Sequence, residues 1–257
     1  MNKISVLFSL LLLSASSTVL AIEMVDVELQ LLIDISGSVD NSEYNLQMQG
    51  YKAAFESDNV QNAIIGGING KIAVQLIMWS GRDQQEIMID WTLIDSADTG
   101  DAFAATIDTL ARPFSGMTAI GSAINYGYSQ FENNGFESLS QVIDVSGDGT
   151  NNSGSSPSTA SADALAAGID KINGIVITTN QRVIDQYTNS VVAGDNAFLL
   201  APATFSEFQS AIETKITYEI KGLIPPGDLI TPIPEPKTIY LALISFIVLY
   251  FNKKRFI

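Results

Sequence analysis

The sequence predicts an α/β protein with a doubly wound, mostly parallel central sheet, one antiparallel edge strand and helices on both faces. Three observations support this fold class. Short apolar segments typical of strands alternate with amphipathic segments typical of helices. Two of the strand-like segments are joined by a short polar turn, which predicts a hairpin at the edge of the sheet. Hydrophobic residues make up 46% of the 257 residues, enough to build a sizeable core.

The first half of the chain begins with a strand and a helix. The segment Val27 to Asp34 alternates at first and then becomes wholly apolar, as expected of a buried strand. Asp40 and Glu43 have the spacing of a helix capping box, so we expect a helix to follow Asp40. Its apolar stripe comprises Tyr44, Met48, Tyr51 and Phe55. The next predicted elements are strands over 72–79 and 87–91, joined by a turn at 80–85, and a helix over 102–110.

The second half continues the alternation. Apolar residues at helical spacing, such as Ile120 and Ile124 or Phe208 and Ile212, mark amphipathic helices. Short apolar runs mark further strands of the central sheet. The predicted helices are 120–131, 158–168, 181–191 and 205–216, and the predicted strands are 142–145, 175–178 and 197–200.

Composition excludes several classes of function. The chain has 28 acidic and 13 basic side chains and a formal charge of −15, so a nucleic-acid partner is not expected. It has no cysteine, which excludes disulfides, thiolate metal sites and cysteine nucleophiles. It also has no histidine, which excludes imidazole metal sites and Ser-His-Asp catalysis.

The N-terminal segment, 1–21, has the features of a secretory signal peptide. Lys3 supplies the positive start, Ile4 to Leu13 form an apolar stretch, and cleavage is expected after Ala21. The alternative is a buried element of an intracellular protein. With a signal peptide, the predicted folded domain covers 22–221.

The C-terminal segment, 237–257, is a second membrane-directed stretch, and a proline-rich linker at 222–236 precedes it. Its uncharged run, 238–251, would span about 21 Å as a helix, less than the ~30 Å hydrocarbon core. A basic cluster at 252–255 follows. The tripeptide Pro234-Glu235-Pro236, the apolar run and the basic end together resemble the PEP-CTERM sorting signal of Gram-negative bacteria.

That resemblance implies an exosortase-type processing enzyme as a partner, removal of the tail, and delivery to the cell surface or extracellular matrix. Contact with the membrane would be made only through the tail, before processing. An ordinary tail anchor is the alternative. Removing both ends would remove five basic residues and no acidic one, so the remaining domain would be more acidic still.

Oxygen-bearing side chains cluster where predicted strands end. Asp34, Ser36 and Ser38 follow the first strand, and carboxyl ends of strands form the binding crevice of doubly wound sheets. Thr118 precedes a predicted helix, and Asp148 follows an apolar strand. Carboxylates and hydroxyls suit a hard cation, although a serine-rich turn with a capping aspartate would look similar.

Asp34, Ser36, Ser38, Thr118 and Asp148 resemble, in order and context, the metal-ion-dependent adhesion site (MIDAS) of von Willebrand factor type A (vWA) domains. The resemblance covers residues 25–221 and extends to a secreted bacterial branch without assigned function. It implies that these five residues are the metal ligands for Mg²⁺, or for Mn²⁺ or Ca²⁺. It also implies that a protein or acidic polymer would complete the coordination with a carboxylate.

Two acidic residues compete for roles at this site. Asp144 lies within the strand that precedes Asp148 and should point away from the crevice if Asp148 points into it. Asp40 could reach the crevice but is better placed to cap the helix.

We therefore expect a non-enzymatic, metal-dependent adhesion module on the cell surface. One alternative is a Mg²⁺-dependent hydrolase of the phosphatase type with Asp34 as nucleophile, although Ser36 stands where such an enzyme needs a second carboxylate. The other alternative is a structural matrix protein with a stabilising metal site.

Overall fold

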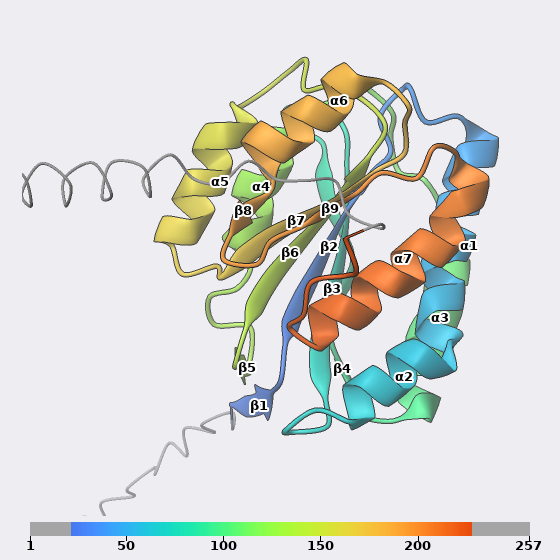
Figure 1. Ribbon diagram of the computed structural model, residues 1–257, viewed down its shortest axis with the longest axis vertical. Helices are drawn as coiled ribbons and strands as arrows, with labels where there is room; N and C mark the ends of the chain where they lie inside the picture. The colour runs from blue at the N-terminus through green and yellow to red at the C-terminus, as the bar shows by residue number, and fades with distance from the viewer. Residues whose placement is uncertain (1–21, 228–257) are drawn as a thin grey trace, which may run out of the picture.

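The computed structural model describes residues 22–227, which contain a central sheet between two layers of helices (Figure 1). The predicted signal peptide and C-terminal sorting segment lie outside these residues. The sheet has the strand order β4-β3-β2-β6-β7-β8, with β9 beside β7. Its strands are β2 (Glu28–Asp34), β3 (Ile72–Trp79), β4 (Gln85–Ile94), β6 (Gln141–Gly147), β7 (Lys171–Val176), β8 (Ala193–Gly194) and β9 (Leu199–Leu200).

The pairing confirms the doubly wound, mostly parallel sheet. Strand β2 is central and pairs in parallel with β3 on one side and with β6 on the other. The predicted hairpin is present, since β4 pairs antiparallel with β3 at one edge. The two-residue strand β8 is a second antiparallel strand, on the other side of β7, which the sequence did not predict.

Helices cover both faces of the sheet, and each layer encloses its own apolar core (Figure 1). One layer consists of α1 (Asn41–Glu56), α2 (Asp58–Ile65), α3 (Ala97–Asp108) and α7 (Phe205–Ile220). The other consists of α4 (Ile120–Tyr128), α5 (Pro157–Ala166), α6 (Gln181–Gln186) and the π-helical turn η1 (Tyr187–Val191). Every residue of β2 is buried between the two layers.

Several element boundaries differ from the sequence prediction. Helix α3 begins at Ala97 because Ser96 and Thr99 form its capping box, a pairing less conspicuous than Asp40 with Glu43. Strand β7 begins at Lys171, since the polar Asn173 that interrupts its apolar pattern is buried and hydrogen-bonded. Besides β8, three further elements were not predicted: α2 and the short paired strands β1 (Glu23–Val25) and β5 (Phe136–Ser138).

None of the helices between residues 22 and 227 combines the length and the apolar character needed to cross a membrane. The hydrophobic run at 238–251, on which the predicted membrane contact depends, falls outside this range.

Candidate metal centre

The candidate centre lies at the carboxyl ends of the two adjacent strands β2 and β6. Asp34 is the last residue of β2, and Asp148 follows directly after the end of β6. The chain leaves β2 toward β3 on one side, whereas β6 lies on the other side, so the strand order reverses between β2 and β6. Such a switch point is where doubly wound sheets bind ligands.

Hydrogen bonds connect the five residues that the sequence singled out. Ser36 Oγ lies 3.1 Å from Ser38 Oγ, and Thr118 Oγ1 donates to Ser36 Oγ at 3.3 Å. Ser38 Oγ donates to Asp148 Oδ1 at 2.6 Å, and the Ser36 amide donates to Asp34 Oδ1 at 2.7 Å. The structure thus brings together residues from three segments that are distant in the sequence.

The Asp34 carboxylate is fully buried, and one of its oxygens is unsatisfied. Oδ2 has no hydrogen-bond partner within residues 22–227. Burial, together with the nearby charge of Asp148, raises the pKa of Asp34 to about 7. Burial also raises the pKa of Asp148, although the hydrogen bond from Ser38 opposes the change. The two aspartates therefore lack a nearby cation that would compensate their charges in full.

Two residues that the sequence analysis did not single out hold the loops of the centre. The Arg112 guanidinium donates to the carbonyls of Ile35 and Ser36, at 2.6 and 2.7 Å. It fixes the turn after β2, and its charge lowers the pKa of Asp34 only slightly. Asn152 exchanges two 2.9 Å hydrogen bonds with the Thr118 backbone, which ties the second loop to the third.

Tyr187 is a third residue that the sequence analysis missed. Its ring is fully buried in η1, and its hydroxyl has no hydrogen-bond partner in the described part of the chain. A Cβ built on Gly147 would collide with Tyr187 Oη and lie 2.9 Å from Asp34 Oδ2. Glycine at 147 therefore lets the hydroxyl and the unsatisfied carboxylate oxygen approach the same small space. No local sequence pattern indicated this approach.

The two competing acids take other roles. Asp40 is the N-cap of α1, where it accepts hydrogen bonds from the amides of Ser42 and Glu43. Asp144 forms an ion pair with Lys215 of α7, in the helical layer that also contains α1. It therefore does not join the five clustered residues.

The chemistry of the cluster fits a hard divalent cation. Two carboxylates and three hydroxyls provide only oxygen donors, which Mg²⁺, Mn²⁺ and Ca²⁺ accept. No group of three or more acidic side chains placed to hold a metal occurs between residues 22 and 227, so a cation here would depend on the hydroxyls. Asp34, Ser36, Ser38, Thr118 and Asp148 would hold it, and the unsatisfied Asp34 Oδ2 is an oxygen in need of a positive partner.

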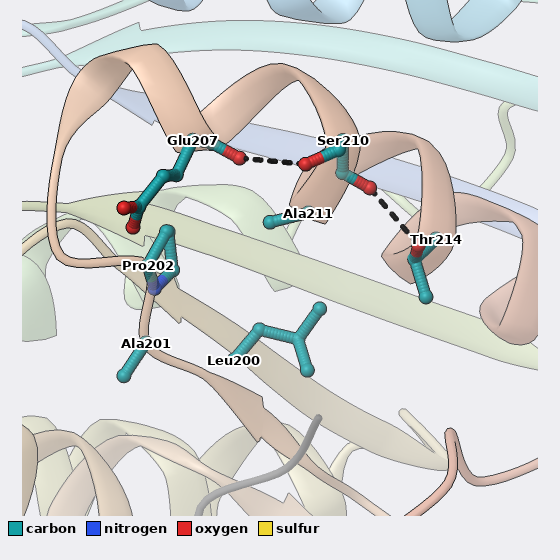
Figure 2. A pocket seen from close by; sticks show the side chains of 7 residues that line it. All are labelled: Leu200, Ala201, Pro202, Glu207, Ser210, Ala211 and Thr214. Atoms are coloured by element: carbon teal, nitrogen blue, oxygen red, sulfur yellow. Dashed lines mark hydrogen bonds between the residues drawn. The ribbon is translucent and has the colours of Figure 1, made fainter. Parts of the chain in front are cut away.

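A separate hollow of about 370 Å³ lies between α7 and the segment that follows β9 (Figure 2). Its two hydroxyl groups are engaged within α7, because Ser210 donates to the Glu207 carbonyl and Thr214 donates to the Ser210 carbonyl (Figure 2). The hollow shares no residue with the oxygen cluster. It is lined by Leu200, Ala201, Pro202, Glu207, Ser210, Ala211 and Thr214.

Solved structures with a similar fold are vWA-type domains. Proximal thread matrix protein 1 from the mussel byssus, solved with a zinc-occupied MIDAS motif, matches with a TM-score of 0.59 and 17% identity. That match covers 77% of this chain and 48% of the mussel protein. The pilus adhesin SpaC from Lactobacillus rhamnosus GG matches with a TM-score of 0.56 and 14% identity, over 77% of this chain and 30% of SpaC.

A von Willebrand factor type A protein from Catenulispora acidiphila matches with a TM-score of 0.52 and 10% identity, over 77% of this chain and 43% of its own. This chain therefore spans about half the length of the mussel protein and less of the other two. No curated protein matches the sequence.

The fold of residues 22–227 is that of a vWA domain. Residues 24–224 match the family described as protein of unknown function DUF1194, and the chain belongs to that family.

Proposed function

We propose that this protein is a metal-dependent binding module that holds a divalent cation at the Asp34 cluster and engages an acidic ligand through it. The observation that carries the proposal is the convergence of five oxygen-bearing side chains around a buried carboxylate with one unsatisfied oxygen. Only two of the five side chains are charged, so the cation would keep its attraction for a further negative ligand, which a carboxylate from a partner would supply. A highly acidic protein could thus bind an acidic protein or polymer.

The proposal includes Mg²⁺ as the cation, with Mn²⁺ or Ca²⁺ as alternatives. The zinc-occupied MIDAS of the mussel protein supports a divalent ion in a site of this architecture. It also includes display at the cell surface, which the signal-like 1–21 segment, the sorting-like tail and the fold similarity to a pilus adhesin support. We infer a non-enzymatic role, because Ser36 occupies the position at which a phosphatase using Asp34 would need an acid.

Calorimetry with Mg²⁺ on the full chain tests the cation site. Wild type should bind Mg²⁺, and Asp34→Ala should not, because it removes a buried carboxylate of the cluster. Asp83→Ala, which alters an exposed acid in the β3–β4 turn, should bind like wild type. Equal affinity in wild type and Asp34→Ala would place the cation elsewhere and overturn the proposal.

Binding to an immobilised polyglutamate or polyuronate tests the ligand class. We expect retention with Mg²⁺ and release with chelator, and loss of retention in Thr118→Ala, which removes one hydroxyl of the cluster. Mg²⁺-dependent stabilisation without retention would instead support the structural matrix role.

A further inference from the structure

A second cluster of ionisable groups lies between β6 and α7 and is enclosed on all sides. Lys215 Nζ is 2.7 Å from Asp144 Oδ1 and also contacts Glu219 Oε1. The side chains of Lys215 and Asp144 have no exposed surface, and neither does that of Glu219. The three groups carry one positive and two negative formal charges, so a proton shared between the carboxyl groups is needed for neutrality.

The surroundings of this cluster are largely aromatic and apolar. The Phe198 ring centroid lies 5.7 Å from Lys215 Nζ. Burial raises the pKa of the nearby Tyr51 hydroxyl, and the charges of Asp144 and Glu219 add to the increase. The Asn173 side chain orients Glu219 by donating from Nδ2 to Oε1 at 2.9 Å, and its Oδ1 accepts from the Phe198 backbone amide at 2.9 Å.

The hydrogen bonding of the ion pair is incomplete. Asp144 Oδ2 and Glu219 Oε2 are buried without a partner anywhere in the described 22–227 range, and so is Tyr51 Oη. A buried ion pair is stable only where further hydrogen bonds satisfy its remaining lone pairs. An amide needs fewer hydrogen-bond partners, because it has only one N–H donor and one carbonyl acceptor.

We propose that Lys215 and Asp144 condense into an intramolecular amide bond, with Glu219 transferring the proton. In the step, the ammonium of Lys215 gives a proton to Glu219, and the free amine attacks Cγ of the protonated Asp144. The N–C bond forms, Glu219 returns the proton to the departing hydroxyl, the C–O bond breaks, and Glu219 takes the second proton from the new amide nitrogen. One ammonium, one protonated carboxyl group and one ionised Glu219 become one amide, one water and one protonated Glu219, with no other reactant.

Enclosure favours both the rate and the direction of this reaction. The amine and the carboxyl group are held at 2.7 Å, which replaces a bimolecular encounter. In water, solvation of the two ions favours the separated acid and amine. Here water is excluded and ions are costly, so the neutral amide is preferred. Burial raises the pKa of Asp144 and raises that of Glu219 to about 7, which supplies the protonated carboxyl group.

The amide would join α7 directly to the central strand β6, upstream of Asp148. Helix α7 is the last helix before the C-terminal linker and sorting-like segment. Tension applied through that end of the chain would then reach β6 through a covalent bond instead of an ion pair.

The test is the mass of the full-length protein and of its tryptic peptides. Whatever processing its two ends undergo, the purified wild type should be lighter by one water molecule than the sequence between its observed ends. Trypsin should not cleave after Lys215, and it should release a branched peptide that joins residues 83–171 to residues 183–221. An unmodified mass with separate linear peptides would overturn the proposal. Loss of water within a linear peptide, as from a cyclised Asp148-Gly149, would overturn it too.

Two variants locate the reaction. Glu219→Gln keeps the size of the side chain but cannot shuttle the proton, so the full mass and cleavage after Lys215 should return. Lys52→Arg is the matched control, because Lys52 also pairs with an acid four residues on, Glu56, but at the surface. It should keep the branched peptide, and a branched peptide in Glu219→Gln would contradict the role given to Glu219.

Discussion

Asp144 and Asp148 come from one strand, β6, and the loop that follows it, yet their carboxylates belong to opposite electrostatic settings. Asp144 faces the α7 layer, where Lys215 supplies a cation from the chain itself. Asp148 lies at the end of the sheet beside Ser38 and near Asp34, where hydroxyls are abundant and no lysine within residues 22–227 pairs with it. Burial raises the pKa of both.

The difference shows two ways of accommodating carboxylates that have lost water. The inner cluster, formed by Asp144, Lys215 and Glu219, contains its own lysine and is closed to solvent, so its reactions involve only groups of the chain itself. The outer cluster is the set of five oxygen-bearing residues around Asp34. Asp34 is buried with one unsatisfied oxygen and Asp148 is partly exposed, so a cation from solution can complete this cluster. Substitutions in the inner cluster should therefore lower the stability of the fold, whereas substitutions in the outer cluster should remove the response to Mg²⁺.

The largest effect is expected from Lys215→Met. It leaves two buried carboxyl groups with neither a cation nor the proposed amide, and removal of one partner from a buried ion pair alone costs about 3–5 kcal/mol. Urea unfolding should show a loss of free energy in that range. The double variant Asp144→Asn with Lys215→Met should recover part of the loss, since less uncompensated charge remains. A loss well under about 1 kcal/mol in the single variant would show that the inner cluster is not strongly coupled.

The second effect is the loss of metal stabilisation in Asp34→Ala. A ligand at a hundred times its Kd stabilises the folded state by about 2.7 kcal/mol, so Mg²⁺ should raise the Tm of wild type. Asp34→Ala should show no Mg²⁺-dependent rise. In chelator it should be nearly as stable as wild type, because the substitution also removes an uncompensated buried carboxylate.

Asp144→Asn provides the opposite pattern, with lower stability in chelator and an intact Mg²⁺-dependent rise. If Asp144→Asn lost the rise as well, the two clusters would not be independent.

A smaller effect is expected from Tyr187→Phe, which removes the hydroxyl near Asp34 Oδ2 and keeps the buried ring. Loss of a group that orients a metal ligand typically lowers metal affinity about 10–100-fold. Calorimetry should show a reduction at the lower end of that range, because the hydroxyl acts through one carboxylate oxygen. Tyr51→Phe removes a buried hydroxyl from the inner cluster and should leave Mg²⁺ affinity unchanged.

Sequence reasoning reached the outer cluster and missed the inner one for a physical reason. Asp34, Ser36 and Ser38 are contiguous and follow a recognisable buried strand, so their convergence depends mostly on local structure. Thr118 and Asp148 were assigned through the resemblance to vWA domains, and the position of Asp148 also agrees with the rule that carboxyl ends of parallel strands share one edge. That the five residues bind a cation remains a prediction.

Lys215 and Glu219 have the i, i+4 spacing of an ordinary surface pair. They continue the stripe of Phe208 and Ile212, but a buried lysine is plausible only once Asp144 is known to face it across the core. Asn173 is a similar case, because its polar side chain hid the start of β7 and is buried through contacts with Glu219 and the Phe198 amide. Such contacts join residues far apart in sequence and have no local signature.

The smallest effect concerns the pH dependence of stability in the absence of metal. Burial raises the pKa of Asp34 from 3.8 and that of Glu219 from 4.5, each to about 7. At pH values between the ordinary pKa of these groups and the raised value of about 7, the folded state binds more protons than the unfolded chain. The stability that these groups contribute is therefore full below pH 4 and is lost as the pH rises to about 7. We expect the Tm measured in chelator to fall between about pH 5 and pH 8.

The high acidity of the chain acts in the same direction, so single variants are needed to separate the causes. Glu219→Gln removes one of the two groups whose pKa is raised to about 7 and should flatten the curve, by about 2–4 °C for each kcal/mol of pH-dependent stability lost. The exposed control Asp83→Asn removes the same charge without a buried group and should leave the slope of wild type. A Tm that rises with pH in wild type, or an unchanged slope in Glu219→Gln, would mean that the inner carboxyl group is already ionised in the folded state. An ionised, buried Glu219 needs the Lys215 ammonium beside it, so the inner cluster would then be a plain ion pair and not an amide.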